Sequence, residues 1–424
     1  MNLLNLQIPK THFYTLLELI GSGHNVYSNW HGDHVYENAL GIKTFSKEDN
    51  DFYALNKYYN KDATINFIEK FIDHYNIDVL QVADPGAGYL HTHFKDKIKY
   101  IGPSEESTRL ESDKLFAKEI ANSVGIKTPA ILKKGKYGDD DYCTNLTFPA
   151  IEKCAHHWNP AVNLFNEKDA EKVIAMVKQG SWPRDNSGVA RIDDKYQHSA
   201  LKEIEYFIEE YIDDMIETNV FFVIANGEYK ITHTQQIIGE NLNKTVDERV
   251  WYIGSYIKPL KPEVDKIVRK NAEKFLEKAA KMGGNYEGSF CGAYTSTGDW
   301  YFLEMNVRPD IFNSTQTFMS GDDYLKGMFE DISLFEKAWE DIQIEKLLIT
   351  SEDLYAEYPY HLHVKHNVLI PNNLIIKDNK FYMSDHGTDE TMGAGTIIAS
   401  NHIPKEFIKE VEETTCWKFN EEPI

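Results

Sequence analysis

The sequence predicts an α/β protein with more than one domain. Its 424 residues exceed what one ordinary hydrophobic core encloses, so two to four domains are expected. A stretch with helical apolar spacing, 62–72, is followed by strand-like runs at 77–82 and 99–102, an alternation typical of a small parallel sheet. Further along, the pair Asn226-Gly227 separates two apolar runs and is a strong signal for a β-hairpin.

Composition and charge narrow the functional classes. The chain has 45 basic and 67 acidic residues, and its net charge of −22 argues against direct binding to nucleic acid or to anionic membranes. The four cysteines are widely spaced without a paired metal motif, as expected in a reducing cytosol. We find no secretory signal at the start and no apolar run long enough to cross a bilayer. We therefore expect a cytoplasmic protein, either a monomer or a dimer.

Two short segments of the first hundred residues are candidate ligand sites. Residues 84–88, Asp-Pro-Gly-Ala-Gly, follow a predicted parallel strand, where such sheets bind ligands, although a plain glycine turn is the alternative. His91 and His93 would point the same way on a strand and could chelate a metal. Because no third ligand is evident, a solvated or hydrogen-bonded pair is the default interpretation.

The segment 113–124 has the apolar spacing of a helix. Ser112 can cap its first turn, and Gly125 suits the left-handed position that follows a helix. Lys114 and Lys118 lie one turn apart on this helix. Taken alone, such a pair indicates two solvated lysines.

The rest of the chain alternates predicted strands, helices and hairpins. A strand over 148–154 carries Lys153 and is followed by the pair His156 and His157, for which a structural or substrate-pocket role is favoured over metal binding. The further elements are a helix over 167–179, a strand over 205–212, a hairpin over 218–237, a helix over 262–281, a hairpin over 289–307 and short strands at 380–383 and 395–399.

The second strand of the late hairpin, 301–308, carries the most informative pattern. Alternation places Glu304, Asn306 and Arg308 on one face. The opposite face is apolar, with Leu303, Met305 and Val307. A carboxylate and an amide oxygen are ligands suited to Mg²⁺, and the arginine can hold an oxyanion or phosphate. An edge strand with a solvated polar face is the alternative.

These features occur in an order that resembles the ATP-grasp superfamily. A lysine on an early helix and a lysine on a strand precede an acidic strand, and a late strand reads Glu-x-Asn-x-Arg. Within the superfamily, the chain is similar to phosphoribosylamine–glycine ligase, an enzyme of purine biosynthesis. The segments that carry this finer resemblance are 101–104, 110–119, 125–129 and 304–308.

The resemblance implies an ATP-grasp fold with a Rossmann-like N-terminal domain and a small, β-rich C-terminal domain. The implied boundaries are 1–102 for an N-terminal α/β substrate domain, 103–345 for the ATP-grasp domain and 346–424 for the C-terminal domain. A mobile lid subdomain would span about 128–212.

The resemblance also implies how ATP is held. Lys114 and Lys153 would contact its phosphates, because two point cations can hold a polyphosphate between two subdomains. Glu217 would accept hydrogen bonds from the ribose hydroxyls. The hinge beside the adenine would consist of Glu209, Glu210, Tyr211 and Ile212. The backbone of Tyr211 and Ile212 would bond the adenine edge, and Glu209 would approach its amino group.

The implied reaction is an ATP-dependent ligation. Glu304 and Asn306 would hold Mg²⁺, with Mn²⁺ as an alternative, and Arg308 would be the catalytic residue that stabilises an acyl-phosphate. A carboxylate becomes an acyl-phosphate, and an amine then displaces phosphate to give an amide, ADP and phosphate. Glycine or a similar small amino acid is the implied carboxylate, and the amine is left open.

Three segments depart from the family pattern. Residues 155–160 are bulky where the family closes a glycine-rich loop, and 235–241 replace a basic segment that holds a ribose phosphate. Cys291 stands where other ATP-grasp enzymes have a third acidic ligand, and a thiol binds Mg²⁺ poorly. Two alternative functions therefore stay open: a nucleotide-binding module without catalysis, and ligation of an amino acid to a modified nucleotide or base.

Overall fold

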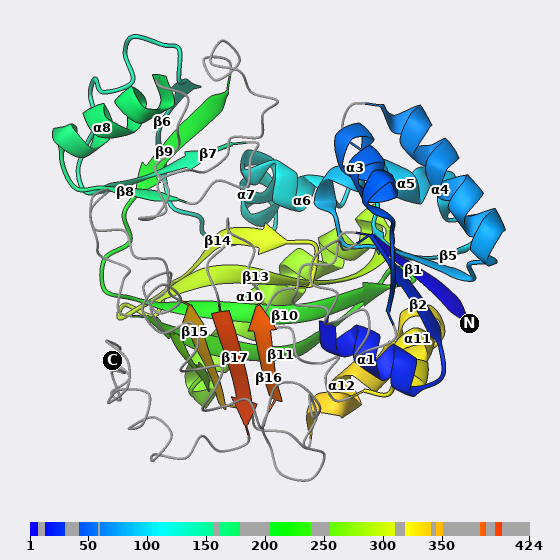
Figure 1. Cartoon of the computed structure of the whole chain (residues 1–424). Helices are drawn as coiled ribbons and strands as arrows, with labels where there is room; N and C mark the ends of the chain where they lie inside the picture. Colours follow the sequence, from blue (N-terminus) through cyan, green and yellow to red (C-terminus); the bar gives the residue numbers. More distant parts are fainter. Residues whose placement is uncertain are drawn as a thin grey trace, which may run out of the picture.

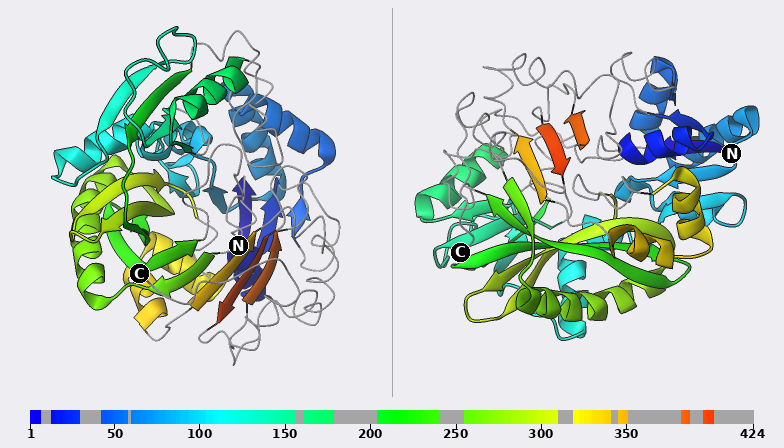
Figure 2. Two further views of the ribbon diagram at one scale, coloured as in Figure 1. Left: turned by 90° about the vertical axis from the view of Figure 1, so that its left-hand side faces the viewer. Right: turned by 90° about the horizontal axis from the view of Figure 1, so that it is seen from below.

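The computed structural model is a mixed α/β protein built on two β-sheets, which confirms the predicted fold class (Figures 1 and 2). Among the described residues, the larger sheet joins 13 strands and the smaller sheet joins 4. The structure describes residues 1–6, 13–29, 42–57, 60–155, 161–178, 204–239, 255–309, 319–340, 345–350, 382–386 and 395–400.

The N-terminal part is a parallel sheet with helices on its faces. Its strands pair in the order β3-β2-β1-β4-β5, as the alternation of the first hundred residues predicts. Leu4, Leu80 and Ile68 bury their side chains in its core. The elements are β1 (Asn2–Leu6), α1 (Phe13–Gly21), β2 (Asn25–Ser28), β3 (Lys43–Thr44), α3 (Lys47–Asn56), α4 (Lys61–Tyr75), β4 (Val79–Val82), α5 (Tyr89–Phe94) and β5 (Lys99–Pro103).

The segment 84–88 forms a short turn after β4. The Asp84 carboxylate accepts a hydrogen bond from the Gly86 backbone N–H at 2.9 Å, and Lys57 Nζ lies 3.4 Å from its other oxygen. The side chain of Asp84 is therefore used to close this turn and to hold α3 against it.

His91 and His93 lie on α5, so the prediction of a strand here is wrong. Residues two apart on a helix point about 200° away from each other, which prevents joint chelation. His93 Nε2 lies 2.8 Å from Glu69, and the ring of His91 packs against Tyr100. The default interpretation of a hydrogen-bonded histidine therefore holds for His93.

A small antiparallel sheet occupies the part of the chain between 131 and 210, with α8 against it (Figure 1). Val173 of the helix packs with Ala150 and Ile208 of the sheet. The strands follow the order β6-β9-β7-β8. The elements are β6 (Ile131–Lys136), β7 (Ala150–Cys154), β8 (Val162–Leu164), α8 (Glu167–Lys178) and β9 (Glu205–Glu210).

The antiparallel part of the large sheet carries α10 on one face (Figure 2). Phe275 of α10 stacks on Phe302 with ring centroids 4.9 Å apart. Asn226 and Gly227 both have positive φ, as expected for the predicted hairpin turn. The elements are β10 (Met215–Ala225), β11 (Glu228–Gly239), β12 (Ser255–Pro259), α10 (Pro262–Ala279), β13 (Gly284–Thr295) and β14 (Trp300–Asn306).

The two halves of the large sheet are joined through β13. Its first residues, Gly284 and Asn285, pair with Pro103 and Gly102 at the end of β5. The antiparallel strands therefore continue the N-terminal parallel sheet, and the carboxyl ends of β4 and β5 lie beside the start of β13.

Two short helices connect the N-terminal part to the small sheet. They are α6 (Arg109–Ser112) and α7 (Lys114–Ser123). The N-cap of α7 is Asp113, whose side chain accepts from the Phe116 N–H, so the assignment of the cap to Ser112 is wrong. Ser112 instead ends α6. Gly125 has a φ of +78°, the left-handed conformation predicted for it.

The later strands extend the large sheet at its end beyond β12. β15 pairs with β12, and the strands predicted near 380 and 395 are β16 and β17. These elements are α11 (Gly321–Phe329), α12 (Ser333–Glu340), β15 (Glu345–Thr350), β16 (Tyr382–His386) and β17 (Gly395–Ser400). None of the described helices combines the length and apolarity that a bilayer crossing requires.

Candidate nucleotide and metal site

The polar face predicted on the late strand is present at the end of β14. Glu304 and Asn306 are half-buried, and Arg308 follows just beyond the strand. Met305 and Val307 point the opposite way into the core beneath α10. The strand thus separates an apolar face from a face with a carboxylate, an amide and a guanidinium.

A bulge corrects the predicted alternation on the apolar side. The pairing of β13 with β14 shifts between Cys291 and Gly292, so Leu303 is the extra residue. Phe302 rather than Leu303 therefore joins the core. The bulge re-aims the strand just before Glu304, which places the polar residues on the face away from α10.

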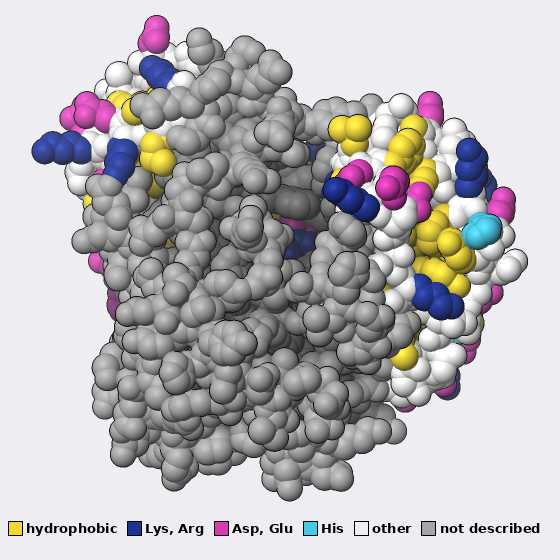
Figure 3. Space-filling view, in the orientation of Figure 1, with side chains coloured by type: hydrophobic (Ala, Val, Ile, Leu, Met, Phe, Trp, Pro, Cys, Tyr) yellow, Lys and Arg dark blue, Asp and Glu magenta, His cyan; other side chains and the backbone are white. Residues whose placement is uncertain are grey.

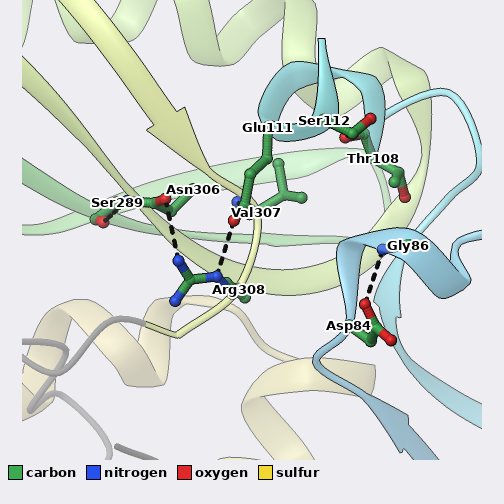
Figure 4. A network of polar contacts seen from close by, with 9 residues as sticks. All are labelled: Asp84, Gly86, Thr108, Glu111, Ser112, Ser289, Asn306, Val307 and Arg308. Atoms are coloured by element: carbon green, nitrogen blue, oxygen red, sulfur yellow. Dashed lines mark hydrogen bonds and ion pairs between the residues drawn. The ribbon is translucent and has the colours of Figure 1, made fainter. Parts of the chain in front are cut away.

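Arg308 is oriented by Glu111, a buried residue of α6 (Figure 4). Arg308 Nε donates to one carboxylate oxygen of Glu111 at 2.8 Å, and the Val307 N–H donates to the other at 2.8 Å. Arg308 Nη2 reaches Asn306 Oδ1 at 3.5 Å. Burial raises the pKa of Glu111, and the Arg308 charge opposes this rise. Glu111 therefore holds the guanidinium beside Asn306.

A second charged cluster centres on Glu209 of β9. Its carboxylate is fully buried and lies 2.6 Å from Lys118 Nζ and 2.8 Å from Lys153 Nζ. Burial alone would raise the pKa of Glu209, but the two lysine charges outweigh burial and lower it. The expectation that Lys118 is solvated is wrong, because α7 packs this side chain, 2% exposed, against β9.

Electrostatics joins the two clusters into one site. Burial lowers the pKa of Lys114, and the Glu304 charge is the strongest influence against this shift. Glu304 also favours the charged forms of Lys118 and Lys153. Lys114 is half-buried, so the expectation of a solvated side chain is wrong for Lys118 alone. Three lysines from α7 and β7 thus lie within the field of a carboxylate on β14.

The donor set suits a metal bound by few protein ligands. Across the β13–β14 pair, Cys291 lies opposite Glu304 and Ser289 lies opposite Asn306. Within the described ranges, no three His, Cys, Asp or Glu side chains gather to hold a metal. Mg²⁺ commonly takes one or two protein oxygens and completes its shell with phosphates and water. Glu304 and Asn306 fit this pattern.

The predicted hinge residues lie where β9 leaves the small sheet for β10. Glu210 accepts a hydrogen bond from the Ala130 N–H at 2.9 Å, so its side chain fastens the hinge to the segment before β6. Tyr211 packs near Phe165, and Ile212 is buried. Glu217 is a buried residue of β10. The roles of these residues at the adenine and ribose stay predictions.

Glu209 differs from the other hinge residues in what its side chain contacts. The carboxylate expected at the adenine amino group is engaged by Lys118 and Lys153 in this structure. Its role toward adenine stays a prediction. The pair His156 and His157 lies outside the described residues.

Two residues of the site were not assigned to it from the sequence: Lys118, which was interpreted as solvated, and Glu111. Lys118 lies four residues after Lys114 and thus on the same face of α7, a signal that could have found it. Glu111 is separated from Arg308 by 197 positions, and no local pattern links them. Figure 3 shows acidic and basic side chains together near the centre of one face of the molecule.

The two sheets, with charged residues of both converging on one site, define an ATP-grasp fold. N5-carboxyaminoimidazole ribonucleotide synthetase (PurK), solved with ADP, is similar at a TM-score of 0.64 and 12% identity, over 97% of this chain and 95% of that one. Biotin carboxylase from Campylobacter jejuni matches at 0.60 and 16%, over 97% and 90%.

L-amino acid ligase from Bacillus licheniformis is a third similar structure. Its TM-score is 0.61 at 11% identity, and the match covers 97% of each chain. A scan against protein-family models finds no match. A search of curated proteins likewise finds none. Similarity at this level of identity shows the fold, and the chemistry must be argued from the site.

Proposed function

We propose that this protein is an ATP-dependent ligase that joins a carboxylate to an amine through an acyl-phosphate. The observation that carries the proposal is the field of Glu304 acting on Lys114, Lys118 and Lys153. A carboxylate beside two buried lysines and a half-buried one suits a polyphosphate with its divalent metal, because both signs of charge are then matched. ATP and ADP complexes among the similar structures support this nucleotide.

The chain's own residues mainly position and neutralise charge. Lys114 and Lys153 hold the phosphates from α7 and β7, while Tyr211, Ile212 and Glu217 bind the nucleoside. Lys118 acts through Glu209, which it pairs at 2.6 Å. This pair keeps the carboxylate ionised and holds Lys153 in place.

Glu304 and Asn306 would hold Mg²⁺, or Mn²⁺ in its place. When bound, the metal screens the phosphate charge and favours attack at the terminal phosphorus. A similar structure solved with MgADP supports this choice of metal. Cys291 opposite Glu304 contributes no oxygen, which leaves the two β14 residues as the protein ligands.

The reaction proceeds in two displacements. A carboxylate oxygen of the donor attacks the γ-phosphorus, the bond to the β-phosphate oxygen breaks, and ADP leaves. The amine then attacks the acyl carbon, the bond to the phosphate oxygen breaks, and phosphate leaves with its electron pair. Arg308, held by Glu111, stabilises the negative charge that both steps place on oxygen.

The finer assignment is to an enzyme like phosphoribosylamine–glycine ligase, which would act in purine biosynthesis in the cytoplasm with glycine as the donor. The segments 101–104, 110–119 and 125–129 support it. The replaced segment 235–241 favours a different amine. The similarity to an L-amino acid ligase and to PurK supports small-molecule substrates of both kinds.

The test is a screen for phosphate release. Purified protein is incubated with ATP, Mg²⁺, each standard amino acid as donor and a panel of amines, and products are identified by mass spectrometry. We expect ADP, phosphate and an amide in equal amounts for at least one pair. An amide to a nucleotide or base would support the alternative acceptor class.

Nucleotide binding without turnover would instead support a module that has lost catalysis. Binding of ATP is measured separately by calorimetry, so the two outcomes are distinguished. Failure of both turnover and nucleotide binding would refute the ligase and the binding module together.

A further inference from the structure

Glu287 is a buried carboxylate that the site as described does not use. It lies on β13 two residues before Ser289, and alternation puts both on the face that carries Glu304 and Asn306. Its side chain is 1% exposed, and the Tyr324 hydroxyl is its hydrogen-bond neighbour. A buried carboxylate that faces no cation is costly, so a cationic ligand is expected to complete it.

A small cavity adjoins this carboxylate and has room for about one water-sized group. Its walls come from the carboxyl ends of β4 and β5, from the segment after β14 and from α11. The wall includes Gln81, Gly102, Val307, Pro309 and Tyr324. Carboxyl ends of parallel strands are the usual place for ligands in such sheets.

The surroundings of Glu287 leave its charge uncompensated. The Tyr324 hydroxyl accepts a hydrogen bond from Gln81 Nε2 at 3.0 Å, and the hydrogen bond that it donates to Glu287 lowers the pKa of that carboxyl. Burial is the larger effect and raises this pKa to about 8. No lysine or arginine of the described chain contributes. The group that would satisfy Glu287 is therefore a compact cation with several N–H donors.

We propose that this cavity binds the ammonium group of an α-amino acid whose carboxylate lies at Arg308. The inference rests on the proposed ligase function and narrows its donor to amino acids. In the β13–β14 pair Ser289 lies opposite Asn306, and the same register, continued by two residues, puts Glu287 opposite Arg308. An ammonium group is about the size of water and offers three donors to Glu287.

The first experiment separates the donor step from the unknown amine. Hydroxylamine replaces the natural acceptor: its nitrogen attacks the acyl carbon, phosphate leaves, and a hydroxamate forms. Matched donors, glycine against acetate and L-alanine against propionate, are compared in the wild type, Glu287→Gln and Glu287→Asp. Glu119→Gln, a change of an exposed glutamate on α7, is the control.

We expect the wild type to use an amino acid with a KM at least 30-fold below that of its desamino partner. Glu287→Gln should raise the amino-acid KM about 30-fold and leave the desamino rate and the circular dichroism spectrum unchanged. Glu287→Asp keeps the carboxylate but on a shorter side chain, so its amino-acid KM should lie between those of the wild type and Glu287→Gln. Equal use of both donors by the wild type, or an unchanged KM in Glu287→Gln, would overturn the inference.

A binding measurement keeps the inference testable if no turnover occurs. Calorimetry in the presence of MgADP measures glycine and L-alanine binding to the wild type and to Glu287→Gln. Binding by the wild type that weakens at least 10-fold in the variant would support the ammonium site even if the ligase proposal fails. If neither amino acid binds, or both proteins bind equally, the cavity does not recognise an ammonium group.

Discussion

The charge of Glu304 acts on Lys114, Lys118 and Lys153 together. Its position follows from a bulge in β14 that breaks the strict alternation of the strand. Without this bulge, a regular strand would have aimed Phe302 and Glu304 to the same face. One extra residue thus decides that a carboxylate, and not an aromatic ring, faces the lysines.

Replacing Glu304 by alanine should abolish Mg²⁺-dependent ATP turnover. We expect kcat to fall at least 100-fold, because a metal ligand and the partner charge of three lysines are lost together. Phosphate release at saturating ATP and Mg²⁺ measures this. Glu119→Ala on α7 should keep full activity, and both variants should keep the wild-type circular dichroism spectrum. Retained turnover in Glu304→Ala would place the metal site elsewhere.

Glu287 should make the protein less stable as the pH rises. Its folded pKa of about 8 lies above its ordinary value of 4.5, so the folded state binds the proton more tightly. The stability that this proton confers is complete below about pH 4.5 and is lost towards pH 8, at about 1.4 kcal/mol per pH unit.

Urea denaturation at several pH values tests this expectation. Between pH 5 and 8 the unfolding free energy of the wild type should fall as the pH rises. In Glu287→Gln this slope should be smaller by up to about 1.4 kcal/mol per pH unit. At pH 8 the variant should therefore be more stable than the wild type. Parallel curves for the two proteins would show that Glu287 does not carry a raised pKa.

Between elements, buried ion pairs connect α7 to the small sheet. Lys118 comes from the helix, while Glu209 and Lys153 come from β9 and β7. The three side chains are at most 6% exposed, so each charge depends on its partners rather than on water. The same residues link the small sheet to the helix that begins with Lys114.

Replacing Lys118 by methionine should destabilise the protein by about 2–4 kcal/mol. The aliphatic volume is kept, but the buried Glu209 loses one of its two cations. Chemical denaturation measures the change. Lys270→Met, on the exposed side of α10, is the control and should change stability by less than about 0.5 kcal/mol. A loss in Lys118→Met as small as the control's would mean that Lys153 alone satisfies Glu209.

For the molecule as a whole, the site is assembled from the parallel sheet, the small sheet and the antiparallel strands (Figure 1). Glu111 and Lys114 come from the helices between them, Lys153 from the small sheet, and Glu304 from the large one. A nucleotide bound across these parts should therefore stabilise the folded protein by mass action.

MgADP at about 100 times its dissociation constant should raise the unfolding free energy by about 2.7 kcal/mol. Lys153→Ala should weaken nucleotide affinity at least 10-fold and so remove at least about half of this gain at the same MgADP concentration. Differential scanning fluorimetry with and without MgADP measures this stabilisation. The control variant Lys270→Ala should be stabilised by MgADP as much as the wild type is. An undiminished shift in Lys153→Ala would remove Lys153 from the nucleotide site.

Local patterns predicted much of this fold. The hairpin turn at Asn226 and Gly227, the helix of α10 and the polar face at Glu304 each depend on residues close in sequence. The predictions from the sequence were wrong where a short segment could adopt more than one local structure. Asp113 rather than Ser112 caps α7, and His93 lies on a helix, since short segments fit two periodicities equally well.

The order of helices and strands, the hairpins and the Glu-x-Asn-x-Arg strand were thus readable from the sequence alone, because backbone preferences and side-chain periodicity act over a few residues. Tertiary structure alone decided that Lys118 is buried against Glu209, that Glu111 holds Arg308, and that Glu287 is left without a cation. The charge state and role of a buried group depend on partners brought together by folding, and those partners lie up to about two hundred positions away.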